Sequence, residues 1–283
     1  MERLPNDEKV SIEHALKYAK VACQRSGGHI AVANEVMRLW LAEKPLRSSF
    51  SEDNSVFTHS QQILGKTRSG KRAVLYFHGS EEYLGTHTRL NPNSEHWNGH
   101  DFDSGAVVLS ELEINLFQSL VGELETWDFP RGSKVLLVDD IPEDFAPDGP
   151  YAIVVPIPSQ DLNLNQFPSS KPQQLSVLEI NPFFIGMMGG PANARQIICD
   201  ASNAGYKALR CAHWLEDDLR SRNDYLMRFV CVGSERDGNG APLSYVNIHW
   251  TNVVDPGKVA QFVGIAPSET SVGCKESPGK IRG

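Results

Sequence analysis

The residues best able to do chemistry gather in one stretch of this sequence. Four of the nine histidines fall between residues 78 and 103, together with several Asp and Glu residues. Imidazole and carboxylate are the ligands that hold Zn²⁺, Mn²⁺ or Fe²⁺ without thiolates, and one loop can fold several of them onto an ion. The densest part of the stretch predicts a divalent-metal site with His96, His100 and Asp103 as ligands.

A metal at this place would activate a water molecule for hydrolysis. Glu82 or Glu95 would then act as the general base, and His78 is a further candidate catalytic residue. The alternative is a polar surface loop in which the histidines are incidental. The Asn-Gly pair between His96 and His100 disfavours the helix that carries such a pair in HExxH proteins, and no Glu follows His96.

The apolar run that leads into this stretch supports a second interpretation. Residues 73–85, which contain His78-Gly79, resemble the strand and oxyanion loop of lipase-like α/β-hydrolases. In that family, backbone N–H groups of the His-Gly turn stabilise a developing oxyanion. The resemblance covers only this run, because the sequence contains no GxSxG nucleophile motif.

The same residues also resemble a motif of another enzyme family. His78-Gly79-Ser80 on a strand is similar to the first motif of ADP-ribosyltransferases, in which a His-Tyr-Glu set holds NAD. This resemblance implies NAD-dependent transfer, with Tyr151 and Glu179 as the second and third members. The gap from His78 to Tyr151 is long for that family, and the gap from Tyr151 to Glu179 is short.

Hydrophobic periodicity predicts the elements that must position these residues. Ser110 with Glu113 forms a capping box at the start of one helix, and Gly189-Gly190 precedes another. The helices are predicted at 11–25, 30–43, 110–127 and 189–219, and a polar connecting loop at 46–71. Strands are predicted at 72–79, 105–109, 134–138, 151–157, 175–185, 226–232 and 243–250, the last two forming an antiparallel hairpin.

The order of these elements is not a strict alternation of strand and helix, which favours an α+β fold. We expect an N-terminal helical hairpin packed on a mixed, partly antiparallel sheet with two further helices. The predicted organisation is a helical hairpin at 1–45, an α+β core domain at 46–265 and a flexible tail at 266–283.

The charge and hydropathy of the chain indicate which classes of partner to expect. The chain has 35 acidic and 27 basic residues, giving a net charge of −8, which disfavours general nucleic-acid binding. The competing function is therefore a non-catalytic binding or regulatory protein that docks a basic partner. The sequence has no signal-like N-terminus and no apolar run long enough to cross a bilayer, so no membrane partner and a cytoplasmic location are expected.

Overall fold

The computed structural model describes most of the predicted elements of the chain. The described residues are 12–42, 56–79, 102–103, 106–124, 127–128, 134–147, 149–157, 172–211, 224–233, 246–250, 261–262 and 264–265. The predicted site residues Glu82, Glu95, His96 and His100 lie outside these ranges.

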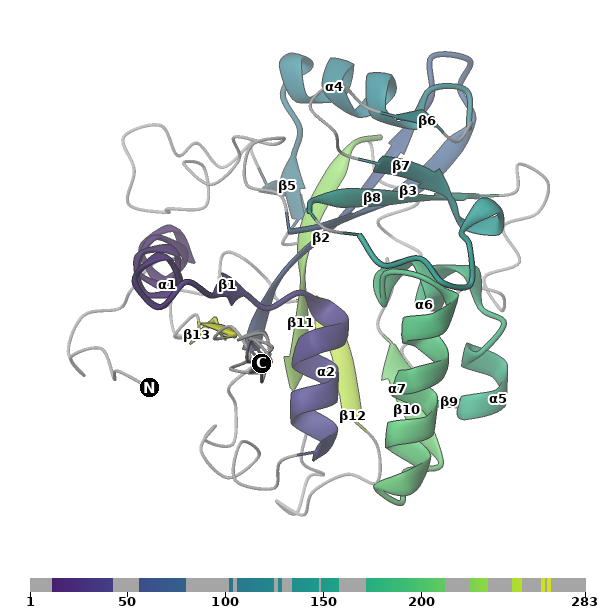
Figure 1. Cartoon of the computed structure of the whole chain (residues 1–283). Coiled ribbons are helices and arrows are strands. Elements are labelled where there is room, and N and C mark those ends of the chain that lie inside the picture. Colours follow the sequence, from purple (N-terminus) through teal and green to yellow (C-terminus); the bar gives the residue numbers. More distant parts are fainter. Residues whose placement is uncertain are drawn as a thin grey trace, which may run out of the picture.

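One mixed sheet forms the centre of the described part of the protein (Figure 1). Its strand order is β6-β7-β8-β3-β2-β11-β12-β10-β9. Pairing is antiparallel from β8 through β3, β2 and β11 to β12, and parallel for β7 with β8 and β10 with β12. The strands are β2 (Val56–Lys66), β3 (Arg72–His78), β6 (Trp127–Asp128), β7 (Lys134–Leu137), β8 (Tyr151–Pro156), β9 (Gln173–Gln174), β10 (Ala208–Cys211), β11 (Leu226–Gly233) and β12 (Val246–Trp250). The fold is therefore α+β with a mixed, partly antiparallel sheet, as the sequence predicted.

Short strands join the margins of this sheet. β5 (Ala106–Val108) pairs with β11 and with β4 (Phe102–Asp103), and β13 (Gln261–Phe262) runs parallel to β2. A separate two-stranded sheet pairs β1 (His29–Ile30) with β14 (Gly264–Ile265). The segment between the first two helices therefore contacts the last described residues of the chain.

Helices cover both faces of the sheet (Figure 1). One face carries α2, α6 and α7, and the opposite face carries α4. α1 packs near β1, β13 and β14 rather than on the central strands, whereas α2 packs on α7. The helices are α1 (Ile12–Ser26), α2 (Ala33–Ala42), α4 (Glu111–Val121), α5 (Leu175–Leu178), α6 (Pro182–Met187) and α7 (Pro191–Asn203), with a 3₁₀ turn η2 (Val138–Asp140).

Two hydrophobic cores follow from the alternation of side chains along the strands. In β3, Val74 and Tyr76 belong to the core under α2, α6 and α7, whereas Leu75 and Phe77 belong to the core under α4. β8 alternates in the same way. Because both faces are covered, β3 is buried almost throughout and reads as an uninterrupted apolar run.

Three predicted segments differ from the structure. The expected loop at 46–71 contains the central strand β2. Its Thr58, Ser60, Gln61 and Gln62 are polar although they are buried, so the segment lacks the apolar pattern that predicts a strand. The strand expected at 175–185 is instead the helical pair α5 and α6. The long helix expected at 189–219 ends at Asn203, where Gly205 takes a positive φ and β10 follows. No helix in the described ranges is both long and apolar enough to span a membrane.

Candidate functional site

The structure places only part of the predicted metal site. Asp103 lies in β4, where its backbone pairs with Ala106, and the other two proposed ligands lie outside the described residues. No group of three or more potential metal ligands occurs among the described side chains. The site at His96, His100 and Asp103 stays a prediction. Elemental analysis of the untagged protein beside a His96→Ala/His100→Ala variant would test it.

His78 ends β3 and is buried, with 1% of its surface exposed. Its Nε2 lies 2.9 Å from the carbonyl oxygen of Gly186 in α6, and its Nδ1 lies 2.9 Å from Oγ of Ser60 in β2. Because a carbonyl can only accept, Nε2 carries the proton and Nδ1 accepts from the Ser60 hydroxyl. His78 therefore links the sheet to α6.

The Ser60 hydroxyl extends this link to α2. Its Oγ accepts a hydrogen bond of 3.0 Å from the backbone N–H of Ala33, the first residue of that helix. We call the connected groups of Ala33, Ser60, His78 and Gly186 the His78 network. Burial lowers the pKa of His78 to about 4, so the imidazole is neutral near pH 7.

A serine hydroxyl hydrogen-bonded to a histidine can act as a nucleophile when a substrate can reach it. Ser60 is completely buried and His78 nearly so, and both His78 nitrogens already have protein partners. The His78 network therefore joins β2, β3, α2 and α6, and its catalytic use would require this part of the core to open.

The structure brings together two of the three residues named by the ADP-ribosyltransferase resemblance. His78 and Tyr151 face each other in the β3–β8 register, with their rings stacked at a centroid distance of 4.8 Å. Both are buried in the core, whereas Glu179 is exposed at the end of α5. Burial raises the pKa of the Tyr151 phenol, and the negative charge of Glu35 raises it further.

The Gly189-Gly190 turn connects α6 to α7, close to Tyr151. Gly189 has φ 80° and Gly190 has φ 123°. A Cβ on Gly189 would lie 2.1 Å from the phenol oxygen of Tyr151. Positive φ and close approach together account for the glycine at position 189.

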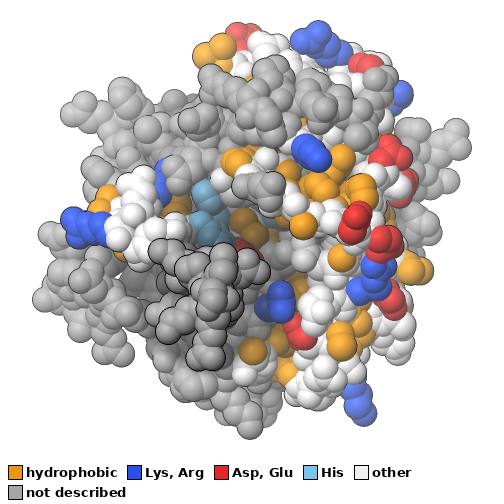
Figure 2. Space-filling view, in the orientation of Figure 1, with side chains coloured by type: hydrophobic (Ala, Val, Ile, Leu, Met, Phe, Trp, Pro, Cys, Tyr) orange, Lys and Arg blue, Asp and Glu red, His pale blue; other side chains and the backbone are white. Residues whose placement is uncertain are grey.

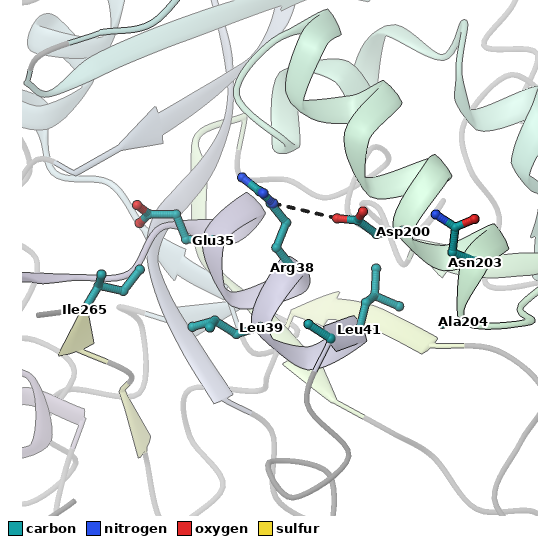
Figure 3. Close-up of a pocket in the computed structure, with 9 residues that line it drawn as sticks. Glu35, Arg38, Leu39, Leu41, Asp200, Asn203, Ala204 and Ile265 are labelled. Atoms are coloured by element: carbon teal, nitrogen blue, oxygen red, sulfur yellow. Dashed lines mark ion pairs between the residues drawn. The ribbon is translucent and has the colours of Figure 1, made fainter. Parts of the chain in front are cut away.

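A surface pocket of about 620 Å³ opens between α2 and α7 (Figure 3). This volume lies within the range of small-ligand sites. We call it the α2–α7 pocket. Its lining combines carboxylate, guanidinium, amide and aliphatic side chains, and comprises Glu35, Arg38, Leu39, Leu41, Ala42, Asp200, Asn203, Ala204 and Ile265.

Helical spacing explains how each helix supplies this lining. Arg38 and Leu39 lie three and four residues after Glu35, so all three residues share one side of α2. Asp200 and Asn203 stand three residues apart at the end of α7. In Figure 3, Arg38 and Asp200 point toward each other, and Glu35 lies on the other side of the Arg38 side chain.

Two carboxylates in the pocket are held in place by neighbours. Glu35 accepts hydrogen bonds from the backbone N–H of Val32 at 2.9 Å and from Nε2 of His29 at 2.9 Å. Asp200 accepts one of 2.8 Å from Nε2 of Gln196. Both carboxylates remain partly exposed, with side-chain exposures of 30% and 26%.

Arg38 is the basic residue of the lining. Its Nε lies 3.7 Å from Oδ2 of Asp200, and 60% of its side chain is exposed. The distance exceeds that of a protein hydrogen bond, so the ion pair is loose. The described lining thus holds two carboxylates against one guanidinium.

Sequence reasoning did not identify this pocket. Its signal was present as polar residues at helical spacing in α2 and α7, but such stripes are usually solvated helix faces. Their approach depends on the packing of α2 on α7, which involves residues far apart in the sequence.

No protein-family model and no curated protein matches this chain. A solved chain from work on "Accommodation of massive sequence variation in Nanoarchaeota by the C-type lectin fold" is 18% identical, with a TM-score of 0.49, covering 87% of this chain and 90% of that one. At this identity and TM-score the similarity carries no argument about function.

Proposed function

We propose that this chain is a non-catalytic binding protein that docks a basic segment of a partner protein in the α2–α7 pocket. The observation that supports this is the composition of the pocket, in which two anchored carboxylates stand beside aliphatic walls. An arginine or lysine has the matching shape, because its charged head follows an aliphatic stem.

The contacts of such a side chain follow from the lining. Its cation would lie beside Asp200 and Glu35, whose side chains are 26% and 30% exposed and whose carboxylate oxygens can each accept more than one hydrogen bond. Its methylene groups would lie against Leu39 and Ala204. Arginine suits this site better than lysine, because its planar guanidinium can bridge two acceptors.

The charge of the molecule favours the same class of partner. The net charge of −8 attracts a basic segment over distances of about the Debye length, roughly 8 Å at physiological salt. Figure 2 shows acidic, basic and hydrophobic side chains interspersed over the part of this face that carries α6 and α7. Selectivity for a basic segment would therefore come from the pocket itself.

The described lining residues are of the types that bind a ligand. It contains groups that bind charge and cover aliphatic surface, and Ser, Thr, Cys and His are absent from its described residues. The described Ser–His pair lies in the core, in the His78 network. This distribution supports binding as the function of the pocket.

An array of capped hexapeptides provides the first test. Peptides that place arginine beside leucine should be retained, and their copies with citrulline or glutamate in place of arginine should not, because only the cation is changed. Asp200→Asn should weaken binding of the best arginine peptide about tenfold, the size expected for a charge-assisted hydrogen bond.

Glu143→Gln is the matched control. It removes the same charge from a side chain that is 69% exposed and lies outside the pocket. Binding should be almost unchanged in this variant. Retention that does not distinguish arginine from citrulline, equal effects of the two variants, or no retained peptide would each overturn the proposal.

A further inference from the structure

We infer that Arg38 is an internal competitor, which occupies the carboxylate of Asp200 until the cationic side chain of a partner displaces it. The inference rests on the proposed function and concerns how the affinity of the same pocket is set. It assigns Arg38 a role opposite to that of Asp200, although the two residues form an ion pair.

The geometry separates the two oxygens of Asp200. Oδ1 accepts the hydrogen bond from Gln196, one turn earlier in α7, so the carboxylate is held in place. The ion pair with Arg38 uses Oδ2 at 3.7 Å, beyond hydrogen-bonding distance. Because the carboxylate is held by Gln196 and its cation lies beyond hydrogen-bonding distance, the Arg38 guanidinium can be replaced there by the cation of a partner.

A second ion pair on α7 gives the comparison. Arg195 donates to both carboxylate oxygens of Glu143, with Nη1 at 3.1 Å from Oε1 and Nη2 on Oε2. That pair has the two-pronged geometry that guanidinium and carboxylate favour. The Arg38–Asp200 pair has Nε at 3.7 Å from Oδ2, and the Arg38 side chain is the more exposed of the two arginines, at 60% against 46%.

Displacement of Arg38 exchanges one cation for another at the same carboxylate. An exposed ion pair contributes little to stability, because water solvates both charges well. The released guanidinium can turn into solvent from its largely exposed position on α2. The incoming residue adds contacts with the aliphatic walls that Arg38 leaves open to the pocket.

Arg38 therefore lowers the affinity of the pocket for cations. Its positive charge repels the incoming side chain, and its contact with Asp200 must be lost before the partner binds. Neutralising Arg38 should increase affinity, whereas a residue that contacts the partner would decrease affinity when it is altered. The sign of the change separates these two roles.

The experiment measures binding of the best arginine hexapeptide by fluorescence anisotropy to the full chain and to single variants. Arg38→Gln should tighten binding about three- to tenfold, and Arg38→Lys, which keeps the charge, should stay close to the wild type. Arg195→Gln is the matched control, since it removes the same charge from α7 outside the pocket. It should change affinity less than twofold.

A double variant completes the test. In an Asp200→Asn background the gain from Arg38→Gln should be smaller, because the carboxylate for which Arg38 competes is absent. Weaker or unchanged binding in Arg38→Gln, with wild-type binding still dependent on Asp200, would overturn the inference and leave the proposed function standing. Loss of binding in every protein, with unchanged circular dichroism, would overturn both.

Discussion

The His78 network and the α2–α7 pocket both contain residues of α2 and of the α6–α7 segment. Their polar groups differ in how deeply they are buried and in how closely they contact their partners. In the network, each nitrogen of His78 lies 2.9 Å from its protein partner, and the ring is 1% exposed. In the pocket, the Arg38–Asp200 pair is 3.7 Å long and partly exposed on both sides.

This difference separates a polar cluster that stabilises the fold from the one that we propose binds a partner. A buried group without its partner is costly, so the His78 network contributes to stability by being complete. A loose, hydrated ion pair contributes little to stability and exchanges readily. Substitutions in the first region should therefore change unfolding, and substitutions in the second should change binding.

The largest expected effect is that of His78→Ala. The substitution leaves a cavity and removes the partners of Ser60 and Gly186, so we expect the free energy of unfolding to fall by about 3–5 kcal/mol. Urea denaturation followed by circular dichroism measures this. His29→Ala, at a side chain that is 58% exposed, should cost less than about 1 kcal/mol. Equal losses would remove the distinction between buried and exposed histidines.

Gly189→Ala should have the next largest effect on stability. The residue combines a φ of 80° with a Cβ position 2.1 Å from the Tyr151 oxygen, and we expect a loss of about 2–4 kcal/mol. Gly70→Ala is the control, because Gly70 has φ 86° with open space around its Cβ position. It should lose about 1–2 kcal/mol from backbone strain alone.

The pH dependence of stability tests the network without altering its shape. The unfolded chain binds a proton at His78 near pH 6.5, whereas burial lowers the pKa in the folded chain to about 4. Between these values the unfolded state binds more protons, so stability is lost as the pH falls. We expect His78 to contribute about 2 kcal/mol of loss between pH 7 and pH 5. His78→Gln should lack this component, and identical slopes would contradict the assignment.

The smallest expected effect is at Glu35, the second carboxylate of the pocket. Glu35→Gln keeps an acceptor for the Val32 N–H but removes a charge from the pocket. We expect a stability loss below about 1 kcal/mol and about threefold weaker binding of the arginine peptide. Titration calorimetry and urea denaturation of the same preparation measure both, and a change in stability alone would place Glu35 outside the binding surface.

Much of the fold could be predicted from local patterns. The capping box of Ser110 and Glu113 marked the start of α4, where the Ser110 N–H donates to Glu113 at 2.8 Å. The apolar run at 72–79 became β3, and β11 pairs antiparallel with β12 as the hairpin pattern indicated. These signals depend on neighbours in the sequence, which is why they could be recognised.

The His78 network and the pocket could not be predicted, because their residues are neighbours in space and not in the sequence. β2 is central yet carries buried polar residues, and Ser60 finds its partner His78 in β3 and Ala33 in α2. Arg38 and Asp200 stand 162 residues apart in the sequence and meet only because α2 packs on α7. Long-range packing makes both clusters, and a single sequence does not reveal it.

The most direct test of the account is to locate the bound peptide by ¹H–¹⁵N TROSY spectra of the labelled protein. The proposal predicts that the arginine hexapeptide shifts amide signals of residues 35–42 and 200–204, while the signals of Ser60 and His78 remain in place. Shifts confined to other parts of the chain, or their absence at saturating peptide, would contradict the assignment of the α2–α7 pocket as the binding site.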